Sequence, residues 1–198
     1  MLQRRAFMMK TSAVIAAAGI ALSGCTATAT KPSANETGQM SKRESIDNGV
    51  QSTLARLYST APGSRELVAK ARGVLVFPSV VAAGFVVGGQ YGEGALLAGG
   101  RTQGYYKTLS ASVGLQIGAQ SKALIFLFMT QDALDKFRAT KGWSVGGDAS
   151  VAVLNVGANG NIDTNTVRAP IEAFVLTNNG LMANLSLEGT KVSPLADR

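Results

Sequence analysis

The side chains that could do chemistry are few in this chain of 198 residues, which has no histidine and a single cysteine, Cys25. Ser-His-Asp and Cys-His nucleophiles, thiolate or imidazole zinc sites and disulfides are therefore excluded. Carboxylates remain, but they are scattered. Asp132 and Asp135 lie three residues apart near the start of an expected helix, where acids stabilise the helix dipole. We expect a non-enzymatic protein without a metal ion or cofactor.

Cys25 closes the sequence Leu22-Ser23-Gly24-Cys25, directly after an apolar run over residues 11–23. The run follows basic residues and is too short to span a hydrocarbon core of roughly 30 Å as a helix, so it predicts a signal peptide. Small residues before a cysteine at this place resemble a bacterial lipobox, whose cysteine is freed at its amine and acylated. We expect a signal peptide over residues 1–24 and a lipoprotein that begins at lipidated Cys25, with an acyl group such as palmitate.

The export route and the membrane follow from neighbouring residues. Arg4-Arg5 resembles a twin-arginine signal incompletely, since Met9 stands where that pattern usually has lysine, so the Sec and twin-arginine routes both stay open. Thr26 replaces the aspartate that usually retains such proteins in the inner membrane. The resemblance therefore implies the outer membrane, facing the periplasm, or the plasma membrane in a Gram-positive source.

Basic residues gather in one segment of the chain. Without residues 1–24, 16 basic and 12 acidic residues remain, a net charge of +4. Such a charge favours anionic surfaces in general, and at 6% aromatic residues the chain lacks a stacking platform for nucleic acid. Residues 41–72 hold six of the bases against three acids. These candidate lipid-binding residues are Lys42, Arg43, Arg56, Arg65, Lys70 and Arg72.

The expected elements that carry this segment are a tether and two helices. Residues 25–40 are small and polar, which is typical of a flexible tether. Residues 41–44 match a capping box and predict a helix from Ser41 to about Tyr58; a second short helix follows Pro62-Gly63. The apolar stripe of the first helix is Ile46, Val50, Leu54 and Leu57. This stripe could dock on the domain or insert in a membrane, and the pattern leaves both open.

From Gly73 onward the pattern changes to the alternation of strands. Residues 74–77 predict a short strand closed by Pro78, residues 105–120 a long half-buried strand, and residues 123–129 a central strand. Thr130 can cap an inserted helix, and Asn179-Gly180 predicts a hairpin turn. We expect an α+β fold: two N-terminal helices packed on a mostly antiparallel, glycine-rich, curved or barrel-like sheet with one inserted helix.

The glycines of residues 88–94 are expected to serve the sheet. The segment contains neither GxxxxGK[ST] nor GxGxxG, and no helix opens after it to place amides on a phosphate. Glycines in strands permit bulges and close approach of another backbone. We therefore predict a structural role and no nucleotide site.

A series of motifs lies in order along residues 41–191. They are Gly73-Val74-Leu75-Val76-Phe77-Pro78, Ala83-Gly84-Phe85, Gly88-Gly89 with Gly92-Glu93-Gly94, residues 112–120, Phe128-Met129-Thr130, residues 133–137, and residues 180–183 followed by 187–190. Together these motifs resemble the SYLF family of lipid-binding domains. The resemblance implies binding to membrane phospholipids, with phosphoinositides preferred by eukaryotic members and actin bound by some fungal ones. Many members have a lysine where this chain has Ala82, so headgroup selectivity does not carry over.

Together these features predict an exported, lipid-anchored domain over residues 41–198 that binds anionic phospholipid through its basic N-terminal segment. The alternative is an envelope module that recruits a protein or cell-wall partner, with the lipid as a tether only. A carboxylate-dependent enzyme is a third hypothesis, and it would require Glu93, Asp148 or Glu188 to converge in a deep pocket. No small-molecule substrate or nucleic acid partner is expected.

Overall fold

The computed structural model describes residues 34–84, 87–113, 120–154, 162, 169–182 and 186–196. The chain divides into two compact units, Met1–Pro32 and Ser33–Arg198, and the second contains every element described below. The expected signal peptide, Cys25 and the tether as far as residue 33 lie outside the described residues.

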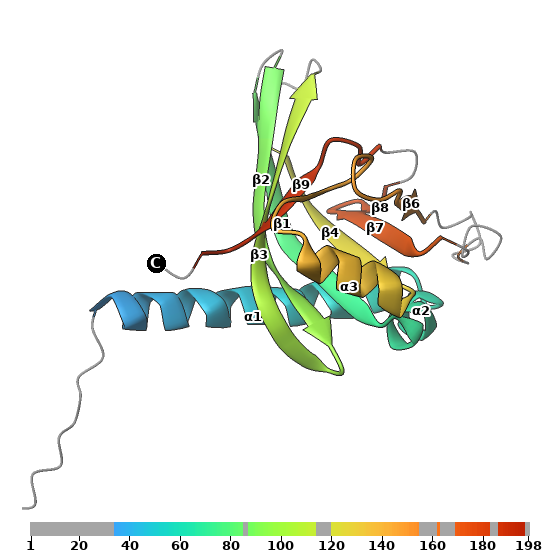
Figure 1. The fold of residues 1–198 in the computed structure, drawn as a ribbon, viewed down its shortest axis with the longest axis horizontal. Helices are drawn as coiled ribbons and strands as arrows, with labels where there is room; N and C mark the ends of the chain where they lie inside the picture. Colours follow the sequence, from blue (N-terminus) through green and yellow to red (C-terminus); the bar gives the residue numbers. More distant parts are fainter. Residues whose placement is uncertain are drawn as a thin grey trace, which may run out of the picture. The chain divides into compact units, whose positions relative to one another are not determined.

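The second unit combines three helices with one curled sheet, so the expected α+β class with a curved sheet is confirmed (Figure 1). All the strand pairs of the described sheet are antiparallel except β6 with β7. The strand order is β5-β9-β3-β2-β1-β4-β7-β6, and β8 pairs with β7. The elements are α1 (Ala34–Thr60), α2 (Ser64–Lys70), β1 (Gly73–Gly84), β2 (Val87–Ala98), β3 (Arg101–Val113), β4 (Gln120–Phe128), α3 (Gln131–Ala139), β5 (Trp143–Ser144), β6 (Ala152–Val153), β7 (Ile171–Thr177), β8 (Gly180–Leu181) and β9 (Lys191–Pro194).

Helix α1 buries the expected stripe but begins earlier than its sequence predicts. Ile46, Val50, Leu54 and Leu57 are all buried, which confirms the helical register. The helix starts at Ala34, so the described end of the expected tether is helical. The capping box at Ser41 is not at a helix start: the Ser41 hydroxyl instead donates to the carbonyl of Gly38, 2.9 Å away, within the helix. A serine hydroxyl inside a helix can bond to a carbonyl of the preceding turn, so a serine need not mark the start of the helix.

Strand β1 continues through Pro78, where the sequence predicts its end. Phe77 and Pro78 together oppose one residue of β2, Gly94, which is the geometry of a β-bulge. A bulge accommodates a residue without an N–H donor, so proline does not break the strand here. Because the bulge adds one residue, the side chains beyond it exchange faces: Phe77 and Val80 both point into the same core.

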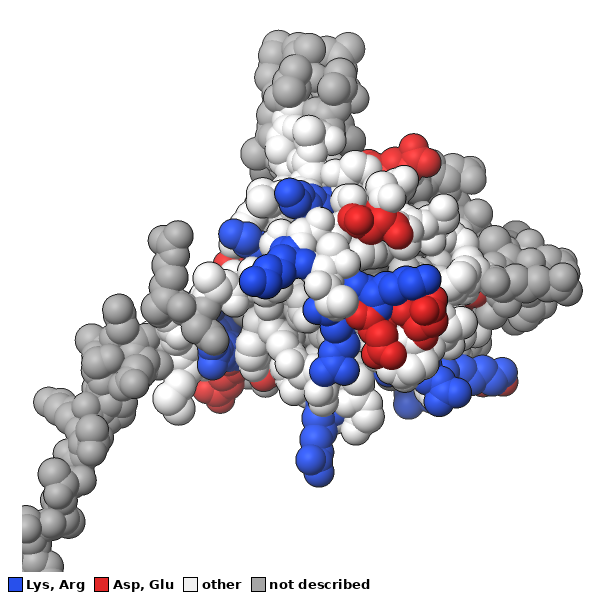
Figure 2. All heavy atoms as spheres, in the orientation of Figure 1, with Lys and Arg blue, Asp and Glu red and all other residues white. Residues whose placement is uncertain are grey.

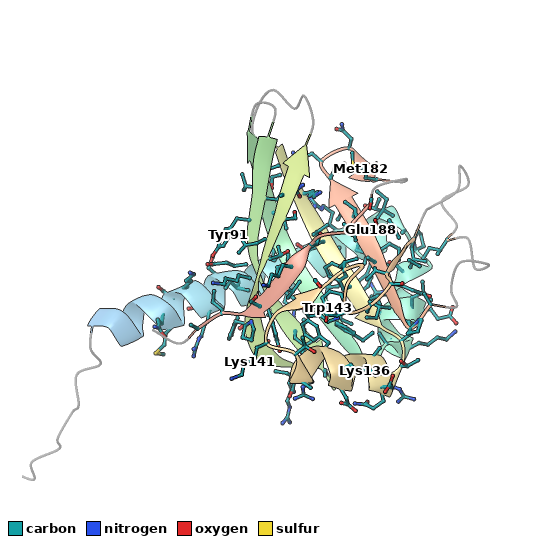
Figure 3. The ribbon with its side chains drawn as sticks, turned by 45° about the horizontal axis from the view of Figure 1, so that its top comes forward. Tyr91, Lys136, Lys141, Trp143, Met182 and Glu188 are labelled. Carbon is teal, nitrogen blue, oxygen red and sulfur yellow. The ribbon has the colours of Figure 1, made fainter. Side chains whose placement is uncertain are left out.

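Two hydrophobic cores lie on opposite faces of the sheet. Helices α1 and α2 cover one, in which Leu57 packs with Ile125 and Phe174. Helix α3 and the segment around β5 cover the other, which is rich in aromatic rings centred on Trp143 (Figure 3). The N-cap of α3 is Thr130, whose hydroxyl accepts from the Ala133 amide, as its sequence predicts. Strand β4 lies between the two cores, which explains its apolar residues on both faces.

Apart from Val80 at its base, which is still buried in one core, the upper part of the sheet extends beyond both cores (Figure 1). We call this part the arm and define it as residues 79–84, 87–93, 107–113 and 120–122, the distal ends of β1, β2, β3 and β4. Strands β1 and β2 stay paired to Gly84↔Gly88, and β2 and β3 to Val87↔Val113. The arm therefore has a continuous hydrogen-bonded backbone although little packs against it.

Candidate functional site

Helix α1 places Lys42 against the foot of the arm. Lys42 lies one turn before Ile46 on the buried stripe of the helix, so its stem points toward the sheet. Its ammonium nitrogen lies 2.7 Å from Oε1 of Glu93 on β2. The Tyr91 hydroxyl donates to the same oxygen, because Tyr91 and Glu93 are two residues apart on one face of the strand. Helix α1 and β2 are thus joined by a charged contact.

The next turn of α1 binds β3 in the same way. Asp47 accepts from the Tyr105 hydroxyl at 2.8 Å and from the Thr102 hydroxyl at 3.0 Å. The Arg43 guanidinium lies over the Tyr105 ring, 5.4 Å from its centroid. Burial, together with the hydrogen bond to and the charge of Asp47, raises the pKa of Tyr105 to about 12, so this hydroxyl stays a donor at neutral pH.

These contacts surround a hollow that we call the basic hollow. It has a volume of about 380 Å³ and is lined by Gln39, Lys42, Arg43, Tyr91, Glu93, Tyr105, Lys107, Leu195 and Ala196. Lys107 of β3 is the register partner of Glu93. Desolvation acts to raise the pKa of Glu93, but the hydrogen bonds from Lys42 and Tyr91 and the charges of Lys42 and Lys107 outweigh it and lower the pKa. Three cations therefore face one ionised carboxylate across this hollow.

A second, apolar groove shares Tyr91 and Glu93 with the basic hollow. Its volume is about 530 Å³, and it runs between α1 and the arm. Ile46, Pro78 and Val81 supply most of its apolar wall. Gly49 allows this close approach, because a Cβ atom there would lie 3.0 Å from two carbons of Pro78. The pair of cavities therefore offers an apolar surface next to a cationic one.

The six basic residues expected to bind lipid fall into two groups. Lys42 and Arg43 line the basic hollow, and Lys107 completes this first group. Arg56 lies 14 residues after Lys42 on α1, which is about 21 Å along the helix axis at 1.5 Å per residue. The structure therefore does not bring the six together, and Figure 2 shows bases and acids interspersed over the visible face. The second group consists of Arg56, Arg65, Lys70 and Arg72.

Two members of the second group, Arg65 and Lys70, contact residues of α1 and α2. Arg65 of α2 lies over the Tyr58 ring, 4.3 Å from its centroid. Lys70 pairs with Glu66 at 2.7 Å, one turn earlier on the same helix. Exposed pairs of this kind contribute little to stability and leave the side chains in water. This group can attract an anionic surface in general, but it lines neither cavity described above.

Sequence reasoning missed Lys107, Tyr91 and Tyr105 as partners of the basic segment. The alternation of residues 105–120 does place Tyr105 and Lys107 on one face, and the described part of β3 confirms it. The hairpin between β2 and β3 turns at Gly99 and Gly100, which both have positive φ. Counting back from that turn pairs Glu93 with Tyr106. An extra residue in β3 shifts the register by one and brings Lys107 opposite Glu93 instead.

Of the acidic residues considered for catalysis, Glu93 lines both cavities described above and the others line neither. Asp132 pairs with Lys136 at 2.9 Å, and both are on exposed turns of α3. Asp148 accepts from the Ser144 amide and hydroxyl, both at 2.7 Å, which lowers its pKa. Glu188 is exposed, on a different side of the view from Tyr91 in Figure 3. Within the described ranges no three histidine, cysteine, aspartate or glutamate residues gather as metal ligands.

The glycine segment of β2 serves the sheet, as its sequence predicts. A Cβ atom on Gly94 would lie 2.0 Å from the Val76 carbonyl oxygen, and one on Gly92 2.8 Å from that of Ser79. Both glycines thus face the bulged strand at distances that only a hydrogen atom permits.

Among the helices of the described residues, none combines the length and apolarity that a membrane crossing requires.

Comparisons with known proteins agree on one family. Residues 109–198 match the model of the Ysc84 family, described as "Las17-binding protein actin regulator". The chain is also 32% identical over 133 residues to SH3 domain-containing YSC84-like protein 1 of rat and of mouse. Each match covers 63% of this chain and 38% of the relative, so the chain spans well under half of the length of these curated relatives.

Proposed function

From the match of residues 109–198 to the Ysc84, or SYLF, family we propose that the chain is a non-enzymatic domain that binds anionic phospholipid at a membrane surface. The observation that carries the proposal is the basic hollow, where α1, β2 and β3 bring Lys42, Arg43 and Lys107 together. Two of these residues come from the basic N-terminal segment, and the third, Lys107, lies two residues before the matched region.

The groups around the hollow suit a phosphate ester. A guanidinium presents a planar fork of donors to phosphate oxygens, and an ammonium adds a compact charge. Glu93 holds Lys42 in place at 2.7 Å. A bound phosphate competes with this carboxylate for Lys42, so affinity is modest and falls with salt. The tyrosines supply hydroxyl groups at the same rim.

Vesicle binding tests the proposal directly. The compact unit Ser33–Arg198 holds both cores and the whole of α1, so it is the fragment to use. We expect it to sediment with phosphatidylcholine vesicles in proportion to their content of phosphatidylglycerol, and less as salt rises. The triple variant K42Q/R43Q/K107Q should weaken this binding by roughly 100-fold, because three basic residues at about 1 kcal/mol each contribute about 3 kcal/mol.

The matched control is R56Q/R65Q/K70Q, which removes the same charge outside the hollow. We expect it to weaken binding less than the first triple variant does. Equal losses in the two variants would show that binding follows net charge and does not depend on the hollow. No charge-dependent binding by the unchanged fragment would overturn the function itself.

A lipid at Cys25 fits this function. Acylation there would hold the domain near the bacterial envelope membrane, facing the periplasm, after removal of residues 1–24. The basic residues would then orient the domain and not attach it. Replacement of Cys25 by serine should release the chain from the membrane fraction and abolish its labelling by palmitate. Membrane retention and label that persist in that variant would contradict the anchor.

The second candidate is a protein-binding module. The words "actin regulator" in the description of the matched family favour a protein partner. In this chain the partner would be an envelope protein or cell-wall polymer, with the lipid as a tether. A crosslinked partner that is retained by K42Q/R43Q/K107Q, together with absent vesicle binding, would favour this candidate over phospholipid binding.

A further inference from the structure

Three exposed apolar side chains form a row across the arm. Five large apolar side chains of the described residues are exposed, and three of them are Val81, Tyr91 and Leu109, with 44%, 45% and 46% of their surface accessible. Val81 is the register partner of Tyr91, and Tyr91 is that of Leu109. The three therefore lie side by side on one face of β1, β2 and β3. We call them the apolar row.

The surroundings of the row contain no charge toward the tip of the arm. The sequence has no Asp, Glu, Lys or Arg over residues 74–92 or over residues 108–121. In Figure 2 the described part of the upper arm is accordingly free of coloured spheres. Monomeric proteins normally cover an apolar face or break it with charged residues. An uncharged projection of two hairpins is thus a surface suited to an apolar environment.

Charged groups begin at a fixed distance below the row. Lys107 and Glu93 lie two residues from Leu109 and Tyr91, on the same face of the same strands. Two residues of a strand measure about 7 Å. Lys42 reaches the same level from α1. The arm therefore passes from cationic to apolar over the distance that separates lipid phosphates from the upper part of their acyl chains.

We propose that the apolar row enters the boundary between headgroups and acyl chains of an anionic leaflet while Lys42 and Lys107 contact the phosphates. This inference rests on the proposed function and adds which surface faces the lipid. Tyr91 suits the boundary, because its ring is apolar and its hydroxyl polar. The apolar groove beside the row, with Ile46 and Pro78, continues the same surface toward α1.

Shallow entry is the only depth that the backbone permits. Strand β3 pairs with β9 up to Leu109, and β4 pairs with β7 from Ala123 onward. Beyond these residues the outer edges of β3 and β4 have no further partner among the described strand pairs. Unpaired backbone groups cannot enter the hydrocarbon core without a large cost, so the edges have to stay hydrated. Entry of one face by about 5–10 Å satisfies this condition.

The fluorescence of a tryptophan introduced at position 109 can report whether the apolar row enters the bilayer. The only native tryptophan, Trp143, is buried and gives a constant background. In Leu109→Trp we expect emission to shift to shorter wavelength on vesicles of phosphatidylcholine and phosphatidylglycerol, and brominated acyl chains to quench it. Ala139→Trp on α3 is the matched control and should show neither change. Bound protein without quenching at position 109 would overturn the inference and leave the proposed function standing.

A charge in the row should prevent entry. The variant V81D/L109D should lower the partition coefficient onto these vesicles by about tenfold or more, since it places two carboxylates at the boundary. Both positions are exposed, so folding should be retained. Met182→Asp changes another exposed apolar residue, which Figure 3 shows on a different side of the view from Tyr91, and should have little effect.

The remaining outcomes are also decisive. Quenching at position 109 on vesicles without anionic lipid, and no dependence on salt, would support entry of the row and contradict the anionic recognition proposed above. A shift in emission that depends on protein concentration without vesicles, with a dimer in size-exclusion chromatography, would assign the row to a second copy of the chain. An absence of vesicle binding under all these conditions would overturn both proposals.

Discussion

The lower and upper halves of the same four strands differ sharply in what surrounds them. In the lower half, Phe126 and Leu127 of β4 point to opposite faces, and both are fully buried between two cores. In the arm, Val81, Tyr91 and Leu109 expose nearly half of their surface. The backbone pairing extends through both halves, with one register shift at the bulge of β1 and another near the turn between β2 and β3. Strand pairing alone therefore does not make a core, and the lower half has to provide the stability that lets the arm expose apolar residues.

The two halves also treat carboxylates differently. Glu93, at the foot of the arm, is bonded to Lys42 and Tyr91, and these hydrogen bonds outweigh its partial desolvation and lower its pKa. Glu172 of β7, the register partner of Leu127 in the lower half of β4, is fully buried, and neither of its oxygens has a hydrogen-bond partner. Desolvation raises the pKa of Glu172. The carboxylate of Glu93 thus helps to join α1 to the sheet, whereas an ionised carboxylate at Glu172 would destabilise the folded state.

The largest expected effect is the removal of a ring from the lower half. Phe126 makes edge contacts with Phe77 at 6.3 Å and Trp143 at 5.9 Å between ring centroids. Phe126→Ala should reduce the free energy of unfolding by about 3–5 kcal/mol, because it leaves a cavity that close-packed neighbours cannot fill. Val81→Ala in the arm should change it by about 0.5 kcal/mol or less. Urea unfolding of residues 33–198 measures both, and similar losses would refute the contrast between the halves.

The next largest effect on stability is expected at Gly94 of β2, and Gly89 of the same strand provides the comparison. Gly94→Ala should cost about 1–3 kcal/mol, because the new methyl group would lie 2.0 Å from the Val76 carbonyl oxygen and the bulge would have to shift. Gly89→Ala in the arm meets no atom within 4 Å, so it should be neutral or stabilising by about 0.4–1 kcal/mol. Thermal unfolding separates the two. A loss of stability at Gly89 would show that the arm is packed more tightly than the structure indicates.

The smallest effect concerns pH. The raised pKa of Glu172 means that its contribution is fully favourable below the unfolded value of 4.5 and is lost as pH rises through the folded pKa. Glu172→Gln should therefore raise the melting temperature by a few degrees at pH 7 and by almost nothing near pH 4. Melting curves of both proteins across this range test the prediction. A difference that stays constant with pH would mean that Glu172 is not strained by its charge.

Local patterns predicted much of the fold and little of the site. The stripe of α1, the Thr130 cap of α3 and the central position of β4 follow from residues that are close in sequence, so their patterns suffice. The expected start of α1 at Ser41 was wrong, because the same hydroxyl can bond inside a helix. The end of β1 at Pro78 was wrong as well, because a bulge absorbs the missing donor. Both errors concern boundaries, where local signals are ambiguous.

By itself, the sequence determined the fold class of the protein and narrowed the chemistry that it can perform. It excluded cysteine and histidine chemistry, gave the α+β class and the family resemblance, and located the basic segment. Only the tertiary structure decided which residues of that segment act together. One extra residue in β3 brings Lys107 opposite Glu93, and the bulge at Pro78 turns Val81 outward beside Tyr91. Because side chains alternate along a strand, a single inserted residue reverses every face beyond it, and that reversal depends on pairing between distant segments.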